Sequence, residues 1–186
     1  MTQLGRLTVQ EIFDGASSTD PAPGAGSVMA MAAAWGVALA LKSVRITHKH
    51  GKGGPETQSA EPELERVGAL LMQDADDDAT GFAAYVAALR RPRSDADREA
   101  AVSQAAAAIA ETALRTLEHA RAARAVCTSL QGKVLPVMDP DMDAAQALLA
   151  AASRTARQDA EESLDKVAPE ELPRVLGQTP SAAGGG

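Results

Sequence analysis

One carboxylate in the sequence stands where an apolar side chain is expected. Residues 64–89 carry hydrophobic side chains at steps of three and four, and Asp78 fills the gap in that stripe. A charge there faces a core or an interface, which is costly unless the charge is paired. Burial would raise the pKa of Asp78 and a cation would lower it. A functional carboxylate fits as well as a structural one that pairs with an arginine or caps another helix. Asp74 lies one turn earlier on the same side, whereas Asp76 and Asp77 are expected to face solvent.

A proline- and glycine-rich junction leads into an Ala-rich helix at residues 21–27. Pro23 stiffens the approach, Gly24 and Gly26 expose the backbone, and Ser27 is placed to cap the first turn. Such a helix start can accept an anion or the polar edge of a ligand. An ordinary capped turn gives the same pattern, and local chemistry alone favours it.

A basic strip follows at the end of the same helix. Lys42 and Arg45 come directly after the apolar segment and are candidates for binding carboxylates or phosphates, and Lys52 continues the strip. The alternative is a solvated helix end that complements the macrodipole, which is favoured for Lys49 and His50. No metal site is expected, because His48 and His50 are two residues apart and no third ligand is evident.

The abundance of Ala predicts an all-α protein, an antiparallel bundle of about five helices. Thr8 with Glu11, and Ser94 with Asp97, have the spacing of capping boxes. Residues 1–175 form the predicted helical domain and residues 176–186 a disordered tail. The predicted helices cover about residues 8–15, 27–48, 62–91, 94–130 and 143–167.

Composition excludes several classes of protein. The net charge of −7 argues against a general nucleic-acid binder. Cys127 is the only cysteine, which excludes a disulfide framework within the chain and fits a reducing, cytoplasmic compartment. Residues 21–41 are uncharged, but they are Ala- and Gly-rich and predict a buried helix rather than a membrane span. Small residues surround this helix, so burial against a second copy is expected, giving a homodimer with Asp78 near the interface.

Several segments together resemble the cyclodeaminase/methenyltetrahydrofolate cyclohydrolase family over about residues 7–167. The junction and the acidic segment that ends in Phe82 are the most specific. The matching segments are Pro-Ala-Pro-Gly-Ala-Gly-Ser-Val at 21–28, Ala-Trp-Gly-Val-Ala-Leu at 34–39, Arg-Ile-Thr at 45–47, Gly-Lys at 51–52, Asp-Asp-Asp-Ala-Thr-Gly-Phe at 76–82 and Asp-Ala-Ala at 143–145.

The resemblance implies an all-α bundle, usually a homodimer, that binds tetrahydrofolate derivatives. Family members close 5-formiminotetrahydrofolate with loss of ammonia, or open 5,10-methenyltetrahydrofolate to the 10-formyl form, without a redox cofactor or a metal. Asp78 would be the base or the electrostatic stabiliser, and Arg45 or Lys52 would meet the glutamate tail. The implied substrate-binding residues are Pro23, Gly24, Gly26, Ser27, Lys42, Arg45, Lys52, Phe82 and Asp143.

Departures from the family pattern keep three hypotheses open. Arg45 stands where the family has an asparagine, and Glu161 and Asp165 are matched to asparagines of the last long helix. The first hypothesis is a folate enzyme, with the hydrolytic reaction slightly favoured because no transferase domain is present. The second is the same fold with a related cyclisation, elimination or imine hydrolysis on a non-folate substrate in a specialised pathway. The third is a non-catalytic helical interaction module in which Asp78 pairs with Arg45.

Overall fold

The computed structural model describes residues 3–177, and their regular secondary structure is helical throughout. The predicted all-α class is therefore confirmed. The predicted tail, residues 176–186, lies outside the described residues except for Leu176 and Gly177. Four long helices form the body: α2 (Ala25–Lys49), α3 (Pro55–Leu89), α4 (Arg98–Ser129) and α5 (Asp139–Leu164). Shorter elements are 3₁₀ turns at Leu4–Arg6 and Pro136–Met138 and the helices α1 (Val9–Ala16) and α6 (Leu172–Val175).

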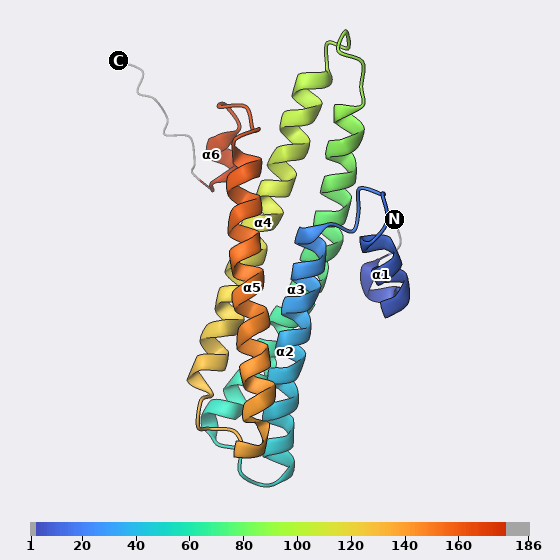
Figure 1. Cartoon of the computed structure of the whole chain (residues 1–186). Helices are drawn as coiled ribbons and strands as arrows, with labels where there is room; N and C mark the ends of the chain where they lie inside the picture. Colours follow the sequence, from blue (N-terminus) through green and yellow to red (C-terminus); the bar gives the residue numbers. More distant parts are fainter. Residues whose placement is uncertain (1–2, 178–186) are drawn as a thin grey trace, which may run out of the picture.

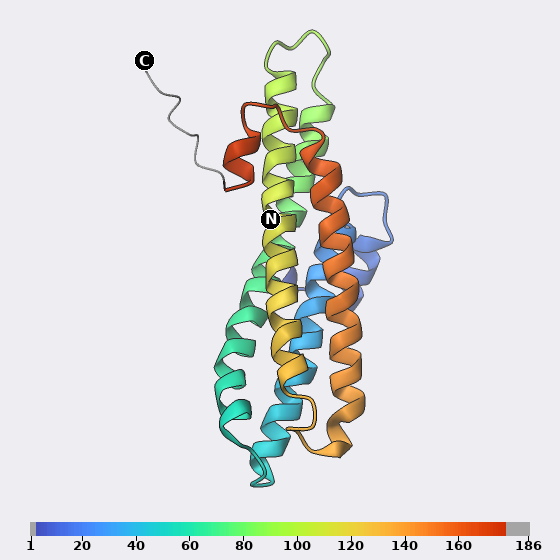
Figure 2. The same cartoon turned by 90° about the vertical axis from the view of Figure 1, so that its left-hand side faces the viewer.

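The four long helices form an antiparallel bundle in which each packs mainly against two neighbours, in the order α2, α3, α4, α5 and back to α2 (Figures 1 and 2). Their lengths differ. The 35 residues of α3 span about 52 Å, whereas the 25 residues of α2 span about 37 Å. Because α2 begins part-way along the bundle, α3 and α4 continue past its N-terminus (Figure 1).

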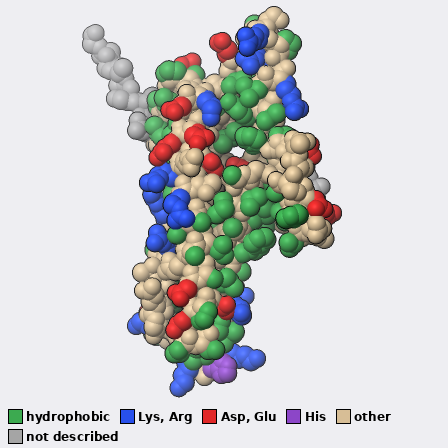
Figure 3. Space-filling view, in the orientation of Figure 1, with side chains coloured by type: hydrophobic (Ala, Val, Ile, Leu, Met, Phe, Trp, Pro, Cys, Tyr) green, Lys and Arg blue, Asp and Glu red, His purple; other side chains and the backbone are tan. Residues whose placement is uncertain are grey.

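Small side chains dominate the interior, as the composition predicts. Ala33, Ala40, Ala120 and Ala152 are fully buried. A Cβ atom on Gly36 of α2 would lie 3.1 Å from the Ala145 carbonyl oxygen of α5, so these two helices touch through their backbones. In the space-filling view, hydrophobic side chains also form a band along one face (Figure 3).

Helix α2 is the one described helix long and apolar enough, by length and composition, to cross a membrane. Buried core helices pass the same test, and 56% of its most apolar window is buried inside the bundle. Val37 and Val44 at its centre contact the core rather than the surface.

Three predicted helix boundaries are wrong. Helix α3 begins at Pro55 and keeps Pro62 inside it, because the burial of flanking side chains such as Leu64 offsets the hydrogen bond that a proline cannot donate. Helix α4 begins at Arg98, and Asp97 makes no side-chain cap, so the second predicted capping box does not form. Helix α5 begins four residues early, at Asp139, because Pro140 fits its first turn.

Of the two caps predicted at the starts of α1 and α2, one is correct and one is wrong. The capping box of Thr8 and Glu11 is present at the start of α1. Helix α2 is capped by Gly24 without a side-chain hydrogen bond, so Ser27 is not its cap.

Candidate active site

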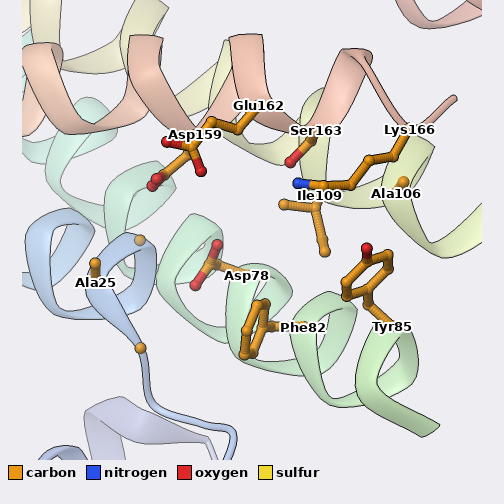
Figure 4. Close-up of a pocket in the computed structure, with 12 residues that line it drawn as sticks. Ala25, Asp78, Phe82, Tyr85, Ala106, Ile109, Asp159, Glu162, Ser163 and Lys166 are labelled. Atoms are coloured by element: carbon orange, nitrogen blue, oxygen red, sulfur yellow. The ribbon is translucent and has the colours of Figure 1, made fainter. Parts of the chain in front are cut away.

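A pocket of about 210 Å³ lies just beyond the N-terminus of α2, between α3, α4 and α5 (Figure 4). The pocket exists because α2 begins only at Ala25. Beyond the N-terminus of α2, the bundle consists of α3, α4 and α5 alone. Its wall combines carboxylates, two aromatic rings and small apolar groups. The lining residues are Gly24, Ala25 and Gly26, then Asp78, Phe82 and Tyr85 of α3, Ala106 and Ile109 of α4, Asp159, Glu162 and Ser163 near the end of α5, and Lys166 just past it.

Asp78 is buried and is held by the first turn of α2. The Ser27 hydroxyl donates a hydrogen bond of 2.6 Å to Asp78 Oδ2, and the Ser27 backbone N–H also donates to this carboxylate. A Cβ atom on Gly26 would come within 2.3 Å of Asp78 Oδ1, so any larger residue there would displace this carboxylate. The carboxylate thus occupies the place where a helix N-terminus stabilises negative charge.

Two effects of opposite sign act on the pKa of Asp78. Burial raises this pKa above its ordinary value and is the larger effect. The side-chain and backbone hydrogen bonds from Ser27 lower the pKa and offset part of the rise. The structure thus confirms that the carboxylate on the apolar stripe is buried.

Asp159 of α5 is a second carboxylate in the same pocket, and its side chain points toward Asp78 (Figure 4). Burial raises the pKa of Asp159 to about 6, and repulsion from Asp78 and from Glu162 adds to the rise. Groups that titrate near neutral pH suit proton transfer.

The outer part of the pocket is aromatic. The ring centroids of Phe82 and Tyr85 are 6.4 Å apart, and Phe82 is 38% exposed. Lys166 Nζ lies 5.9 Å from the centroid of the Tyr85 ring, so the aromatic wall carries a cation at its edge. A flat ligand has a face on which to stack beside the carboxylates.

Four of the residues predicted to bind substrate are brought together here. Gly24, Gly26 and Phe82 line the pocket, and Ser27 holds Asp78. Pro23 precedes them but is not among the lining residues. Its ring lies 3.1 Å from where a Cβ atom on Gly15 would be, so it packs α1 against the start of α2.

The predicted basic residues do not share this pocket within one chain, which corrects the grouping expected from the sequence. Arg45 is 18 residues from Ser27 along α2, or about 27 Å. Lys42 pairs with Asp141 at 2.8 Å, and Lys52 is exposed just past the end of α2.

Asp143 is likewise remote from Asp78. It lies near the start of α5, by a separate hollow that Cys127 and Met142 also line. The pair of Asp78 with Arg45 does not form either, since Arg45 binds Glu61 and Glu65.

The end of α5 contains site residues that the sequence analysis missed. Asp159, Ser163 and Lys166 follow one another at helical spacing and face the pocket. Glu161 and Asp165, which were matched to the family's asparagines, are exposed and do not line it. The i, i+4, i+7 spacing was a usable signal, but the many charges at this helix end hid it.

A second buried carboxylate on α3, Asp74, is fully paired and lies outside the pocket. His119 Nδ1 is 2.6 Å from one Asp74 oxygen, and Arg115 Nε is 3.5 Å from the other. Asp77 binds Arg115 at 2.7 Å, and the Leu4 N–H donates to Asp76. Asp76 and Asp77 are therefore partly exposed, as expected, but each is bound to a partner.

Residues 3–177 contain no group of three or more His, Cys, Asp or Glu side chains that could hold a metal ion. His48, which was weighed as a ligand, instead contacts Thr57 and Glu61.

Fold and pocket together define an all-α bundle protein with a candidate small-molecule site at the N-terminus of one core helix. The chain belongs to the formiminotransferase-cyclodeaminase family, whose model matches residues 8–172. This confirms the family predicted from the sequence. Its fold is similar to that of formiminotetrahydrofolate cyclodeaminase from Thermotoga maritima, with a TM-score of 0.74, 19% sequence identity, and 93% of this chain and 86% of that chain covered. No curated protein matches the sequence.

Proposed function

We propose that this protein is an enzyme acting on a one-carbon adduct of tetrahydrofolate, and that it closes 5-formiminotetrahydrofolate to 5,10-methenyltetrahydrofolate with release of ammonia. The family and the name of the similar solved structure support this substrate class. The observation that carries the proposal is the buried Asp78, held by Ser27 and facing a pocket with aromatic walls. Substrate and product both carry a cationic amidinium carbon, which such a carboxylate stabilises.

Absorbance tests the proposal directly. Purified protein mixed with 5-formiminotetrahydrofolate should speed the rise of the near-ultraviolet absorbance of the methenyl product. Asp78→Asn should remove most of that acceleration while the protein stays folded. A rate equal to that of buffer, with folded wild-type protein, would refute the proposed reaction.

Hydrolysis of 5,10-methenyltetrahydrofolate is the second candidate, because both reactions pass through a tetrahedral adduct at the same carbon. It is measured in the same cuvette as a loss of the near-ultraviolet absorbance. The non-folate alternative depended on Lys42 and Arg45 recognising an anion. Both residues are engaged elsewhere, by Asp141 and by Glu61 and Glu65. Neither reaction needs a metal or a redox cofactor, so activity should survive dialysis against a chelator.

We further propose that the protein works as a homodimer. The pocket of one chain is smaller than the roughly 300–1,000 Å³ of typical ligand sites, so a second copy would supply further wall. Trp35 of α2 is 49% exposed and Phe13 of α1 is 66% exposed, so each leaves apolar surface that a second copy would cover. Light scattering should give about twice the 19.1 kDa of the chain. A mass near 19.1 kDa at all working concentrations would refute the dimer.

A further inference from the structure

Asp78 and Asp159 come from different walls of one pocket, and both carboxylates lie in it (Figure 4). They also both line a smaller cavity beside it, against Gly26 and Met29. The two carboxylates therefore bracket the space in which a bound ligand would sit.

Their surroundings differ in one respect. Ser27 donates two hydrogen bonds to Asp78, at the positive end of the α2 dipole. Within residues 3–177, no side chain or backbone group makes a hydrogen bond or an ion pair to the Asp159 carboxylate. Ser27 thus fixes the position of the Asp78 carboxylate and offsets part of the rise that burial causes in its pKa, whereas the oxygens of Asp159 remain available to accept and return a proton.

We propose that Asp159 is the proton-transferring catalytic residue of this site, and that Asp78 is the fixed anion that stabilises the cationic carbon. This assignment rests on the proposed ring closure. It divides between two residues the roles that the sequence analysis gave to Asp78 alone.

The proposed ring closure takes no proton from the solvent. The N10 lone pair bonds to the amidinium carbon, and the π electrons of the C=N bond move to the exocyclic nitrogen. The proton of N10 goes to the Asp159 carboxylate, which then returns it to the exocyclic nitrogen of the tetrahedral adduct. The C–N bond breaks with its electron pair leaving on ammonia, and the N5 lone pair restores the amidinium cation. Asp159 ends as it began.

The titration of Asp159 fits this role. Its pKa of about 6 makes it basic enough to accept a proton and acidic enough to return it at neutral pH. The ionisable groups facing it are Asp78 and Tyr85 from α3, Glu162 from its own helix, and Lys166 just past the end of that helix. The parts of α2 and α4 that line the two cavities contribute no ionisable side chain.

The kinetic test compares Asp159→Asn with Glu161→Gln, which makes the same chemical change at an exposed position two residues away on α5. Asp159→Asn should lower kcat at least about 100-fold with KM changed by less than about threefold, and Glu161→Gln should keep wild-type kcat. The wild-type rate should fall as pH drops through about 6, and this acid limb should vanish from the residual activity of Asp159→Asn. A wild-type kcat in Asp159→Asn overturns the assignment, even when the proposed reaction is confirmed.

A second measurement needs no substrate. Carboxyl ¹³C NMR should show Asp159 titrating near pH 6 in the wild type and lower in Asp78→Asn, because a like charge has been removed. If the wild type does not close 5-formiminotetrahydrofolate, the proposed function fails and this titration decides the inference. A midpoint near 6 that falls in Asp78→Asn supports a proton-transfer group coupled to Asp78. A midpoint near 4 in both proteins overturns it.

Discussion

Replacing Gly26 by alanine should push the carboxylate of Asp78 off the start of α2. The new Cβ atom would lie 2.3 Å from Oδ1, 2.7 Å from Cγ and 2.8 Å from Oδ2 of Asp78, whereas ordinary contacts begin at 3.4 Å. The carboxylate must therefore retreat by about 1 Å (from 2.3 to 3.4 Å). A shift of that size breaks the hydrogen bond of 2.6 Å from Ser27.

The free energy follows from two opposing contributions. A hydrogen bond to a charged group contributes about 1.5–3 kcal/mol, and replacing glycine by alanine in a helix returns about 0.5–1 kcal/mol. The variant should thus lose about 1–2 kcal/mol of unfolding free energy in urea titrations, and its Tm should fall by a few degrees. Turnover should fall at least about 100-fold, because a misplaced group loses most of its catalytic effect.

Gly68→Ala is the matched control for this variant. It makes the same change inside α3, where the new Cβ atom meets only Val37, 3.2 Å from its Cγ1 atom. The control should stay within about 1 kcal/mol of the wild type and keep its turnover. Wild-type stability and turnover in Gly26→Ala would show that α2 does not fix the position of Asp78.

Three further predictions concern charge and burial. Asp159 has a folded-state pKa of about 6, above its ordinary value of 3.8, so the stability it contributes is present below about pH 4 and lost as pH rises through about 6. The free energy of unfolding of Asp159→Asn, measured in urea, should therefore exceed that of the wild type by about 1–2 kcal/mol at pH 7.5 and equal it at pH 4. The figure allows for the partial exposure of Asp159. Burial raises the pKa of Cys127 to about 11, so a thiol reagent at pH 8 should modify this residue only after denaturant is added, and rapid native labelling would contradict its burial. Because Arg45 binds Glu61 and Glu65 instead of Asp78, the stability changes of Arg45→Ala and Asp78→Asn should add within about 0.5 kcal/mol, and a larger coupling would revive the ion pair between them.

Periodicity was enough to predict the helices and the burial of Asp78, because both depend on spacing within one segment. The stripe in residues 64–89 contains seven steps of three or four residues, and Asp78 is the only carboxylate at one of its positions. The start of α2 was harder, since Ser27 has the chemistry of a cap and its use depends on whether a better partner is near. Asp78, 51 residues away, is that partner.

The prediction that the basic residues share a site with Asp78 and Ser27 failed because it did not consider how far apart they lie along α2. Each residue adds about 1.5 Å, so a helix of 25 residues separates its two ends by more than the width of a small ligand. Ser27 and Lys42 therefore belong to different ends of the bundle, although both flank one apolar segment. Asp159 was missed for the opposite reason: the end of α5 carries charges on most sides, and only the position of α3 across from it decides which of them face inward.

The late start of α2 explains why the pocket, the anion and the glycine occur together. Ending a bundle helix part-way leaves unsatisfied N–H groups at a point surrounded by three continuing helices. Those N–H groups favour a carboxylate, and Asp78 is within reach because Gly26 has no side chain in the way. The volume that the missing turns of α2 would have filled is left open to a ligand, with Asp159 on its far wall. The backbone of residues 24–27 thus accounts both for the open volume and for the place of the Asp78 carboxylate. This is why the junction of two prolines and two glycines indicates the site better than any charged residue of the chain.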